Sequence, residues 1–335
     1  MKYALFGKTG LKVSQVALGT GNFGTGWGYG SDTDTGKAIF NTYAEAGGNF
    51  IDTADTYQFG QSEEMLGALF EGRRDDFVLA TKFSNGAAPN TNQLVTGNSR
   101  KALVASLEAS LKRLKTDRID IFWVHHPDGV TPAEEIVRGF EDLARAGKIL
   151  YAGLSNFSAW RLARAVTLAE MTRAVPIAAA QFEHSLVHRE PEADLFPATY
   201  ALGLGIMTWS PLGGGMLTGK YRRGEKGRAE GFGGKVFQPE NSAQRTQILD
   251  TVIAVASELS ASPGQVAIAW AGTHGAVPII GPRSLTQLND NLGALSLELS
   301  IEQINRLDTA SNLDSSAPAR TPVSWAVGSA PRIIA

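Results

Sequence analysis

The chain has 335 residues, of which 43 % are hydrophobic, and it carries a formal net charge of −2 at pH 7. A charge this close to zero excludes the strong field that would attract the protein to nucleic acid or to acidic membranes. The absence of cysteine excludes disulfide bonds and thiolate metal sites, and it leaves the redox compartment undetermined.

The distribution of apolar residues predicts whether the protein is secreted, membrane-embedded or soluble. Residues 1–7 lack the long apolar run of a signal peptide, and no later segment reaches membrane-spanning length. We therefore expect a soluble cytoplasmic protein. No linker separates two halves of the chain, so residues 1–335 are expected to form a single domain, with residues 312–335 as a C-terminal tail of little periodicity.

The first half of the chain begins with a predicted β-hairpin and then alternates strands with helices. Apolar segments at Tyr3–Phe6 and Leu11–Ser14 flank a turn-forming sequence with glycines at both ends. Strands are then expected at 16–18, 50–52, 77–82 and 119–124, and helices at 33–46, 62–71, about 103–114 and 132–146. Thr131 is the predicted N-cap of the last of these helices, with Pro132 at its first position.

The second half repeats the same alternation. Strands are expected at 149–153, 177–180, 206–208 and 277–280, and helices at 159–171, 192–202, 243–259, 263–274 and 285–292. A long glycine-rich, charged loop covers residues 213–240, and residues 300–310 are predicted to form an extra helix. Strand–helix units repeated in this way favour a (β/α)₈ TIM barrel with an N-terminal β-hairpin and additional helices. An open, doubly wound sheet is the alternative.

Polar residues stand at the ends of most of the predicted strands. In a barrel of parallel strands all these ends face one mouth, where catalytic groups gather. The residues expected at the mouth are Asp52, Lys82, His125, Asn156, Gln181 and Trp209. Their regular placement favours the closed barrel over the open sheet.

A glycine motif after the first barrel strand could suggest a Rossmann fold. Residues Gly19–Gly24 match the dinucleotide-binding pattern G-x-G-x-x-G. A Rossmann helix should start within that motif, whereas glycines continue to Gly30 and the helix begins near Thr33. The acidic residue expected roughly 20 residues further on has no match at a strand end, since Asp52 lies farther along. We interpret this segment as the loop after the first barrel strand, which can still contact a ligand.

Four ionisable groups at the predicted mouth fit one reaction. A free phenol has a pKa near 10, and a nearby ammonium group lowers such a pKa by stabilising the phenolate. Lys82 can supply that ammonium for Tyr57, Asp52 can fix the lysine, and His125 can donate to a substrate carbonyl. Together they suit protonation of an oxygen that becomes negative as a hydride reaches its carbon.

Each of these residues alone is weak evidence. An aspartate at a barrel end is as often structural as catalytic, and a lone tyrosine or lysine more often packs or faces solvent. The sequence His125-His126 with Asp128 could suggest a metal site, but neighbouring strand residues point to opposite faces of a sheet. We therefore expect no metal site.

The chain resembles the aldo-keto reductases over nearly its whole length, from Thr9 to Asn291. The most specific matches are Phe50–Tyr57 with Ser62-Glu63, then Ala80–Lys82 and Asp120–Asp128, and further matches lie at Gly153–Phe157 and Trp209–Leu212. By this resemblance the catalytic tetrad is Asp52, Tyr57, Lys82 and His125. His125 is preferred over His126 because it directly follows the apolar strand.

The resemblance also implies an NADP(H) cofactor that lies extended across the barrel mouth. Ser155, Asn156 and Gln181 would hold the nicotinamide carboxamide, Trp209 would stack on the ring, and the backbone after Ser210 would meet the pyrophosphate. Arg283 would suit a 2′-phosphate. The complete set of implied cofactor contacts is Thr20, Gly21, Asn22, Asp52, Ser155, Asn156, Gln181, Trp209, Ser210, Pro211, Leu212, Gly214, Leu217, Lys220, Gly281, Arg283, Gln287 and Asn291. Without the resemblance, core packing of Trp209 and a surface ion pair of Arg283 are equally good interpretations.

Two positions depart from the pattern of the resembling family. His184 stands where relatives commonly have tyrosine, and Gln58-Phe59 separates Tyr57 from Gly60, where a glycine usually follows directly. Both departures are expected near the mouth, where they would alter substrate fit.

The leading hypothesis is an NADPH-dependent reductase of a small carbonyl compound, reversible to alcohol oxidation, without nucleic-acid or membrane partners. One alternative is a nucleotide-binding regulatory subunit, because ion-channel β subunits resemble this fold; the lack of an N-terminal arm before the hairpin weakens it. Another is a metal-dependent barrel hydrolase that uses His125, His126 and Asp128. The loops at 84–98 and 213–240 and the tail would determine the substrate, which the sequence does not identify, and the oligomeric state is equally open.

Overall fold

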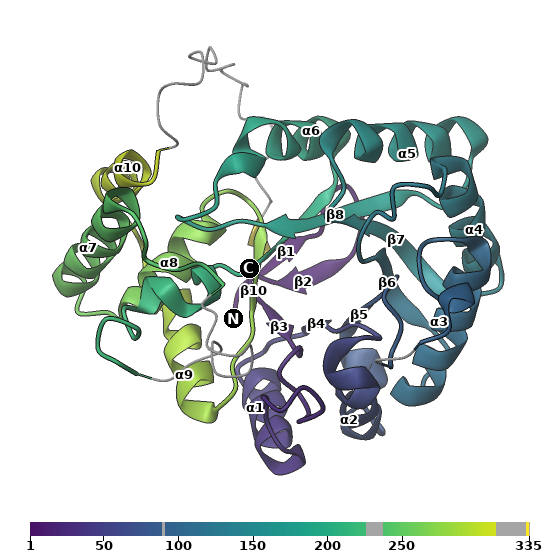
Figure 1. Ribbon diagram of the computed structural model, residues 1–335, viewed down its shortest axis with the longest axis horizontal. Helices are drawn as coiled ribbons and strands as arrows, with labels where there is room; N and C mark the ends of the chain where they lie inside the picture. Colours follow the sequence, from purple (N-terminus) through teal and green to yellow (C-terminus); the bar gives the residue numbers. More distant parts are fainter. Residues whose placement is uncertain (89–90, 226–236, 313–332, 335) are drawn as a thin grey trace.

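A computed structural model describes residues 1–88, 91–225, 237–312 and 333–334. Eight parallel strands close into a barrel in the order β10-β3-β4-β5-β6-β7-β8-β9, and helices surround it (Figure 1). The barrel strands are β3 (Ala17–Gly19), β4 (Phe50–Asp52), β5 (Val78–Phe83), β6 (Ile119–Val124), β7 (Ile149–Ser155), β8 (Ile177–Glu183), β9 (Gly205–Trp209) and β10 (Val277–Ile280). The predicted (β/α)₈ barrel is confirmed, and the open sheet is excluded.

Most residues of the barrel strands are buried, as expected for parallel strands covered on both faces. Every residue of β5, β6 and β8 is buried. Side chains that point inward, among them Phe50, Trp123 and Met207, form one apolar cluster inside the barrel. The barrel is therefore a packed core whose chemistry is confined to its two ends.

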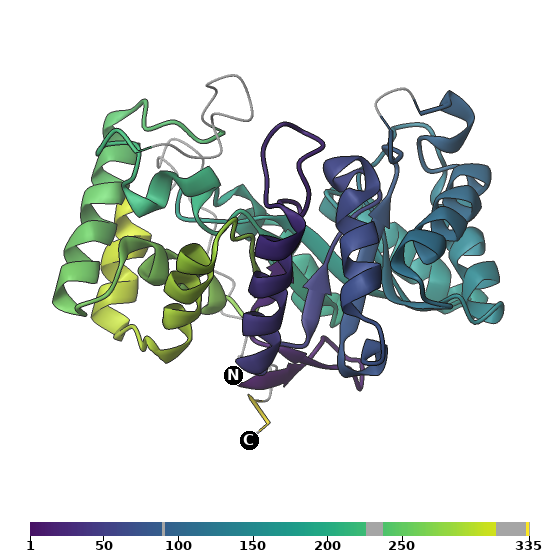
Figure 2. The same cartoon turned by 90° about the horizontal axis from the view of Figure 1, so that it is seen from below.

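The predicted N-terminal hairpin is confirmed as β1 (Tyr3–Leu5) and β2 (Lys12–Ser14), which pair antiparallel. In Figure 2 the hairpin covers the end of the barrel at which the strands begin. Phe6, just after β1, packs edge-on against Phe50 at 5.3 Å between ring centroids. A strand that the sequence did not suggest, β11 (Ile333–Ile334), pairs antiparallel with β1. The rest of the predicted tail from residue 313 onward lies outside the described residues.

Helices cover the outside of the barrel. They are α1 (Thr33–Glu45), α2 (Gln61–Leu69), α3 (Arg100–Leu114), α4 (Ala133–Arg145), α5 (Ala159–Thr172), α6 (Leu195–Leu202), α7 (Ala243–Glu258), α8 (Pro263–Gly272), α9 (Leu285–Gly293) and α10 (Ile301–Ala310). Short 3₁₀ turns are η1 (Tyr57–Gly60), η2 (Arg74–Asp76), η3 (Gln93–Val95), η4 (Glu190–Ala193), η5 (Gly213–Thr218) and η7 (Ala294–Ser296). The predicted extra helix is α10, which packs on α7 at the outer edge in Figure 1.

Two helix starts differ from the prediction. The N-cap of α4 is Pro132 instead of Thr131, because the Thr131 hydroxyl donates to the Asp128 carboxylate. The helix expected at 192–202 is divided into η4 and α6, since Asp194 between them leaves the helical conformation.

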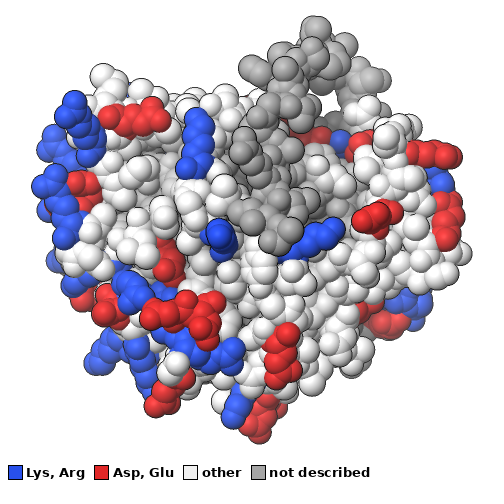
Figure 3. All heavy atoms as spheres, turned by 180° about the vertical axis from the view of Figure 1, so that it is seen from behind, with Lys and Arg blue, Asp and Glu red and all other residues white. Residues whose placement is uncertain are grey.

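The surface is mixed in charge. Figure 3 shows Lys and Arg interspersed with Asp and Glu over the face opposite to that of Figure 1. Among the described residues, no single helix is long and apolar enough to cross a bilayer. The pair α7 and α8 passes that test together, but the two helices are bent by 99°, and their apolar side chains, such as Val252 and Trp270, are buried in the protein.

Candidate active site

Lys82 lies at the end of β5 with its ammonium group fully buried. Its Nζ donates to Oδ2 of Asp52 at 2.5 Å, to the carbonyl oxygen of Thr53 at 3.0 Å and to the hydroxyl of Tyr57 at 3.1 Å. Burial works against the ammonium, but its charge interactions with Asp52 and Tyr57 raise the pKa of Lys82 above its usual value. Lys82 is therefore a cation at neutral pH, and all three of its donors are used.

Asp52 ends β4, next to β5, and is held from two sides. Oδ2 of Asp52 binds Lys82, and Oδ1 accepts a hydrogen bond of 2.9 Å from Nε2 of Gln181. Gln181 comes from β8, and its amide nitrogen also lies 3.8 Å from Sδ of Met207. The sequence missed this contact of Gln181, because no local pattern tells which strand of a barrel faces another across the interior.

His125 follows β6 and presents its ring edge to Tyr57, with 5.9 Å between ring centroids and an interplanar angle of 81°. Burial, followed by the charges of Lys82 and His126, lowers the pKa of His125 well below its usual value. The imidazole is therefore neutral at neutral pH and can donate one hydrogen bond. The four residues predicted to form the tetrad thus lie together at the barrel mouth.

The argument against a two-histidine site was wrong in its reasoning. The rings of His125 and His126 stack at 4.4 Å with an interplanar angle of 13°, because β6 ends at Val124 and side-chain alternation no longer applies beyond it. Asp128, however, does not join them. Its carboxylate accepts hydrogen bonds from the backbone of Asn98, Val130 and Thr131 and from the Thr131 hydroxyl, so it braces a loop.

Asn156 connects three strand ends at the mouth. Its Nδ2 donates to the carbonyl oxygen of His125 at 2.9 Å and lies 3.1 Å from Nδ1 of His126, and its Oδ1 accepts from Nε1 of Trp209 at 3.1 Å. Asn156 adopts a left-handed backbone conformation with φ of 62°, which asparagine tolerates better than most residues. Ser155 is fully buried beside it, and Trp209 is half-buried. Three predicted nicotinamide contacts are therefore neighbours.

The turn after β9 combines left-handed backbone with a cation. Ser210, Gly213, Gly214 and Gly215 all have positive φ, and Oγ of Ser210 accepts from the Gly214 N–H at 3.0 Å. A Cβ on Gly215 would lie 2.7 Å from Nζ of Lys220, so only glycine lets the lysine pass so closely. Burial, followed by the charge of Arg283, lowers the pKa of Lys220. A cation beside a turn of left-handed backbone favours the binding of an anion there.

The remaining candidates lie around the loop after β3 and the end of β10. Nδ2 of Asn22 donates to the carbonyl oxygen of Gly281 at 2.8 Å, and the Arg283 guanidinium lies 4.5 Å from the ring centroid of Tyr29. Thr20 is fully buried and donates to the backbone of Asp52, so its side chain connects β3 to β4 instead of facing a ligand. Pro211, Leu217 and Asn291 are also buried, Gly21, Leu212 and Gly214 are partly exposed, and Gln287 is exposed with Oε1 accepting from the Arg283 N–H.

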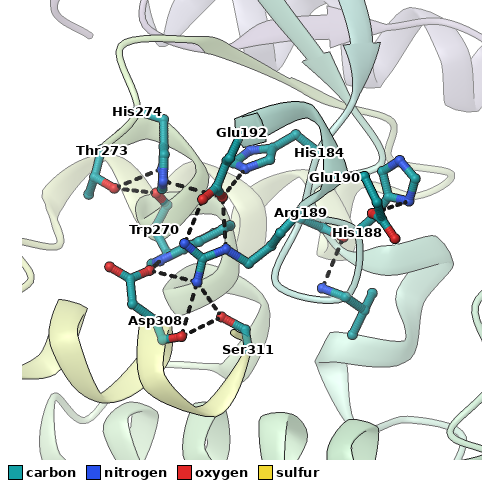
Figure 4. A network of polar contacts seen from close by, with 12 residues as sticks. His184, His188, Arg189, Glu190, Glu192, Trp270, Thr273, His274, Asp308 and Ser311 are labelled. Atoms are coloured by element: carbon teal, nitrogen blue, oxygen red, sulfur yellow. Dashed lines mark hydrogen bonds and ion pairs between the residues drawn. The ribbon is translucent and has the colours of Figure 1, made fainter. Parts of the chain in front are cut away.

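His184 does not line the mouth as the sequence suggested (Figure 4). Its side chain is fully buried and stacks on Trp270 at 5.1 Å, with Nε2 2.8 Å from Oε1 of Glu192. Arg189 binds both oxygens of Glu192, at 2.8 and 2.6 Å. Direct contact of His184 with a substrate is therefore excluded.

The same cluster has the residue types of a metal site. His184, Glu192 and His274 offer three ligand atoms within 4.8 Å of one another. The Arg189 guanidinium on the Glu192 carboxylate disfavours a further cation, and Nδ1 of His184 has no partner among the described residues, whereas metal-bound histidines usually donate their second N–H. The cluster is better explained as a structural connection between the loop after β8 and the ends of α8 and α10.

Comparison with known proteins gives a consistent result. The sequence model described as "Aldo/keto reductase family" matches residues 15–312. The Bacillus subtilis protein named uncharacterized oxidoreductase YrpG is 36 % identical over 319 residues, covering 92 % of this chain and 95 % of that protein. The Schizosaccharomyces pombe aldo-keto reductase yakc [NADP(+)] is 33 % identical over 304 residues, covering 88 % of each chain. A probable voltage-gated potassium channel subunit beta of Oryza sativa subsp. japonica is 36 % identical over 310 residues, covering 89 % of this chain and 92 % of that protein.

Proposed function

The chain belongs to the aldo/keto reductase family, and we propose that it catalyses the reversible, NADPH-dependent reduction of an aldehyde or ketone to an alcohol. One observation carries this proposal. The fully buried Lys82 ammonium contacts the Asp52 carboxylate and the Tyr57 hydroxyl at once, at 2.5 and 3.1 Å. A cation placed between a fixed carboxylate and a partly exposed phenol is suited to proton transfer by the phenol.

In the proposed reaction NADPH, when bound, would be the source of the hydride that reaches the carbonyl carbon. As negative charge develops on the carbonyl oxygen, Tyr57 gives it the phenolic proton, and the product is the alcohol. The phenolate that remains is stabilised by the Lys82 ammonium, which Asp52 and the Thr53 carbonyl hold in place. Solvent then returns a proton to Tyr57, because its side chain is partly exposed.

In this scheme His125 orients the substrate carbonyl by a hydrogen bond and does not transfer a proton to it. Because its imidazole is neutral, it can donate one hydrogen bond to the same carbonyl oxygen and polarise it. Its stacking with His126 and its edge contact with Tyr57 limit the rotation of the ring. The substrate carbonyl would thus be bound between two donors, Tyr57 and His125.

The described residues fit the cofactor in three places. Asn156 and Trp209 would border the nicotinamide, and the left-handed turn from Ser210 to Gly215 would present backbone N–H groups to the pyrophosphate. Lys220 and Arg283 would neutralise phosphate groups. Arg283 is the residue that we assign to the 2′-phosphate, and hence to the preference for NADPH over NADH. Gln181 would contact the carboxamide chiefly through its oxygen, because one N–H of its amide donates to Asp52 and the nitrogen also lies 3.8 Å from Sδ of Met207.

A second candidate function is that of a nucleotide-binding regulatory subunit. The observation in its favour is the similarity to the rice protein named as a potassium channel subunit. Such a protein would bind NADPH without sustained turnover, so the two functions differ in a measurable way.

The proposal is tested with the purified full chain, NADPH and a panel of aldehydes and ketones. We expect loss of nicotinamide absorbance with at least one carbonyl compound, unchanged by a chelator. Tyr57→Phe should lower turnover by a factor on the order of 10² or more while NADPH still binds. Tyr200→Phe, which removes a phenol on α6 far from Tyr57 in the chain, serves as the control and should keep its activity. NADPH binding without turnover on any carbonyl would contradict the proposal and favour the regulatory subunit, and inhibition by the chelator would favour a metal enzyme.

A further inference from the structure

The loop between β3 and α1 is held by two glutamines, Gln58 of η1 and Gln61 of α2. Oε1 of Gln61 accepts from the N–H groups of Thr25 and Gly26 at 2.9 and 3.1 Å, and Gln58 holds the neighbouring residues. We call residues 20–31 the glycine loop. Nε2 of Gln58 donates to the carbonyl oxygens of Gly21 and Tyr29, both at 2.9 Å, and Oε1 of Gln58 accepts from the Trp27 N–H, also at 2.9 Å. Gln58 is fully buried by these contacts. Its side chain thus points into the glycine loop and not toward a substrate.

The backbone around Gln58 is bent to allow this. Gln58, Phe59 and Gly60 all adopt left-handed conformations, with φ of 52°, 56° and 89°. Such conformations are unfavourable for residues with a side chain, and they persist where surrounding contacts compensate for them. Here the three hydrogen bonds of the Gln58 side chain are the compensating contacts.

Three glycines of the loop are required by close contacts, two of them against Gln58. A Cβ on Gly26 would lie 2.6 Å from the carbonyl oxygen of Gln58, one on Gly24 would lie 2.9 Å from Cβ of Gln58, and one on Gly30 would lie 1.9 Å from the carbonyl oxygen of Gly24. No other residue fits at these positions without a shift of the backbone. Gly24 and Gly26 therefore pack directly against Gln58, whereas Gly30 is required by close contacts within the loop itself.

This interface sets the position of Trp27 beside Tyr57. The half-buried Trp27 ring lies 6.1 Å from the Tyr57 ring and 6.4 Å from the Phe59 ring, nearly perpendicular to both. Its backbone N–H is held by Gln58. The far side of the loop meets the end of β10, where the Ser31 hydroxyl donates to the carbonyl oxygen of Arg283 at 3.0 Å.

We propose that Gln58 is a positioning residue that fixes Trp27 as a wall of the carbonyl pocket, and that the size of the accepted substrate is set by Gln58 through Trp27. The inference rests on the proposed reductase function, because Tyr57 is the group that a carbonyl compound must reach. Because the Trp27 ring lies 6.1 Å from the Tyr57 ring, a substrate that binds at the Tyr57 hydroxyl comes close to Trp27. Gln58 itself touches neither substrate nor reacting atoms.

The test compares Trp27→Ala, Gln58→Met and the double variant with the wild type. Kinetics are measured with NADPH and two substrates, a small straight-chain aldehyde and a bulky ring-containing ketone. Gln58→Met keeps the length of the side chain and removes its three hydrogen bonds. Gln303→Met, which removes two side-chain hydrogen bonds of a glutamine on the outer helix α10, is the matched control.

We expect both single variants to change the ratio of kcat/KM for the two substrates by roughly tenfold in favour of the bulky ketone, the scale on which pocket walls discriminate. The change should lie in KM, with kcat for the small aldehyde retained. The double variant should show no more than the larger single effect, because both changes act through one wall. Independent, multiplying effects, or an unchanged ratio in either single variant, would overturn the inference, and so would an equal change in Gln303→Met.

A second measurement does not depend on turnover. The difference in tryptophan fluorescence between wild type and Trp27→Phe reports the surroundings of Trp27. In a Gln58→Met or Gln58→Glu background this difference should shift to the red, since Trp27 loses its fixed position, and an unchanged difference would contradict the role of Gln58. If the wild type turns over no carbonyl compound, the proposed reductase function fails on its own, whatever the fluorescence shows.

Discussion

Gln181 and Asp52 are 129 residues apart in the chain, yet the Gln181 amide donates a hydrogen bond of 2.9 Å to Oδ1 of Asp52. Asp52 is thereby fixed on one side by Lys82 and on the other by Gln181. The family resemblance assigns Gln181 to the nicotinamide carboxamide of the cofactor. In the structure, however, its amide nitrogen donates to Asp52, one of the four predicted catalytic residues. The two roles lead to different kinetic results.

We predict that Gln181→Met lowers kcat and leaves the Kd of NADPH within about threefold of the wild type. A hydrogen bond to a charged group contributes about 1.5–3 kcal/mol, so a decrease in kcat of roughly tenfold or more is expected when Asp52 loses this contact. Stopped-flow turnover and cofactor titration measure the two quantities separately. A weaker Kd with an unchanged kcat would assign Gln181 to the nicotinamide instead.

The buried pair Lys82 and Asp52 should be strongly non-additive in stability. Lys82→Met leaves the Asp52 carboxylate buried without its cation, which should cost about 3–5 kcal/mol in the free energy of unfolding. Adding Asp52→Asn removes that charge, so the double variant should be more stable than Lys82→Met alone but equally inactive. Chemical denaturation of the single and double variants tests this. Additive losses of stability would mean that the two side chains do not act as a pair.

Arg283 should distinguish the two nicotinamide cofactors. If its guanidinium binds the 2′-phosphate, Arg283→Ala weakens NADPH binding by about 1.5–3 kcal/mol and affects NADH far less. Arg306→Ala, which removes a surface arginine of α10 paired with Glu258, is the control and should change neither affinity. Equal losses for NADPH and NADH would contradict a role in reading the phosphate.

Asp55 is a buried carboxyl group that should make the protein less stable as the pH rises. Burial, followed by the charge of Glu63, raises its pKa to about 7 from 3.8, and neither of its oxygens has a hydrogen-bond partner among the described residues. Between about pH 4 and pH 7 the Asp55 carboxyl group therefore keeps its proton in the folded protein, whereas it has lost the proton in the unfolded chain. The contribution of Asp55 to the free energy of unfolding decreases as the pH rises from about 4 to about 7. Above pH 7 this contribution no longer changes with pH.

Asp55→Asn abolishes this titration. The variant should be more stable than the wild type at pH 8 by a few kcal/mol, at about 1.4 kcal/mol for each unit of pKa shift, and the difference should vanish near pH 4. Urea unfolding at both pH values measures the effect. A difference that does not depend on pH would show that Asp55 does not titrate in this window.

His274 should contribute in the opposite direction. Burial, followed by the charge of His184, lowers its pKa to about 4 from 6.5, so the folded protein takes up its proton later than the unfolded chain on acidification. The stability that depends on neutral His274 is present above about pH 6.5 and is lost as the pH falls toward 4. His274→Gln should therefore lose less stability than the wild type between pH 7 and pH 4.5. Parallel losses in the two proteins would contradict this assignment.

The sequence determined the parts of this protein that depend on local pattern. Short buried apolar runs and helical periodicity gave the order of strands and helices, because burial on both faces demands those patterns wherever the strands finally pair. The grouping of the four ionisable side chains could be predicted as well. Asp52, Lys82 and His125 end neighbouring strands, and a parallel barrel brings such ends to one mouth, with Tyr57 on the adjoining loop.

Tertiary structure decided the contacts between segments that carry no shared local signal. Closure of the barrel set Gln181 against Asp52, and packing of η1 on the glycine loop turned Gln58 inward. The burial of His184 against Trp270 depends on where α8 lies, which His184 and its neighbours in sequence do not specify. Thr20 is a predicted cofactor contact, and its hydroxyl is used between β3 and β4 for the same reason. Side-chain direction at a strand end or in a loop depends on partners far away in the chain, and periodicity holds no information about them.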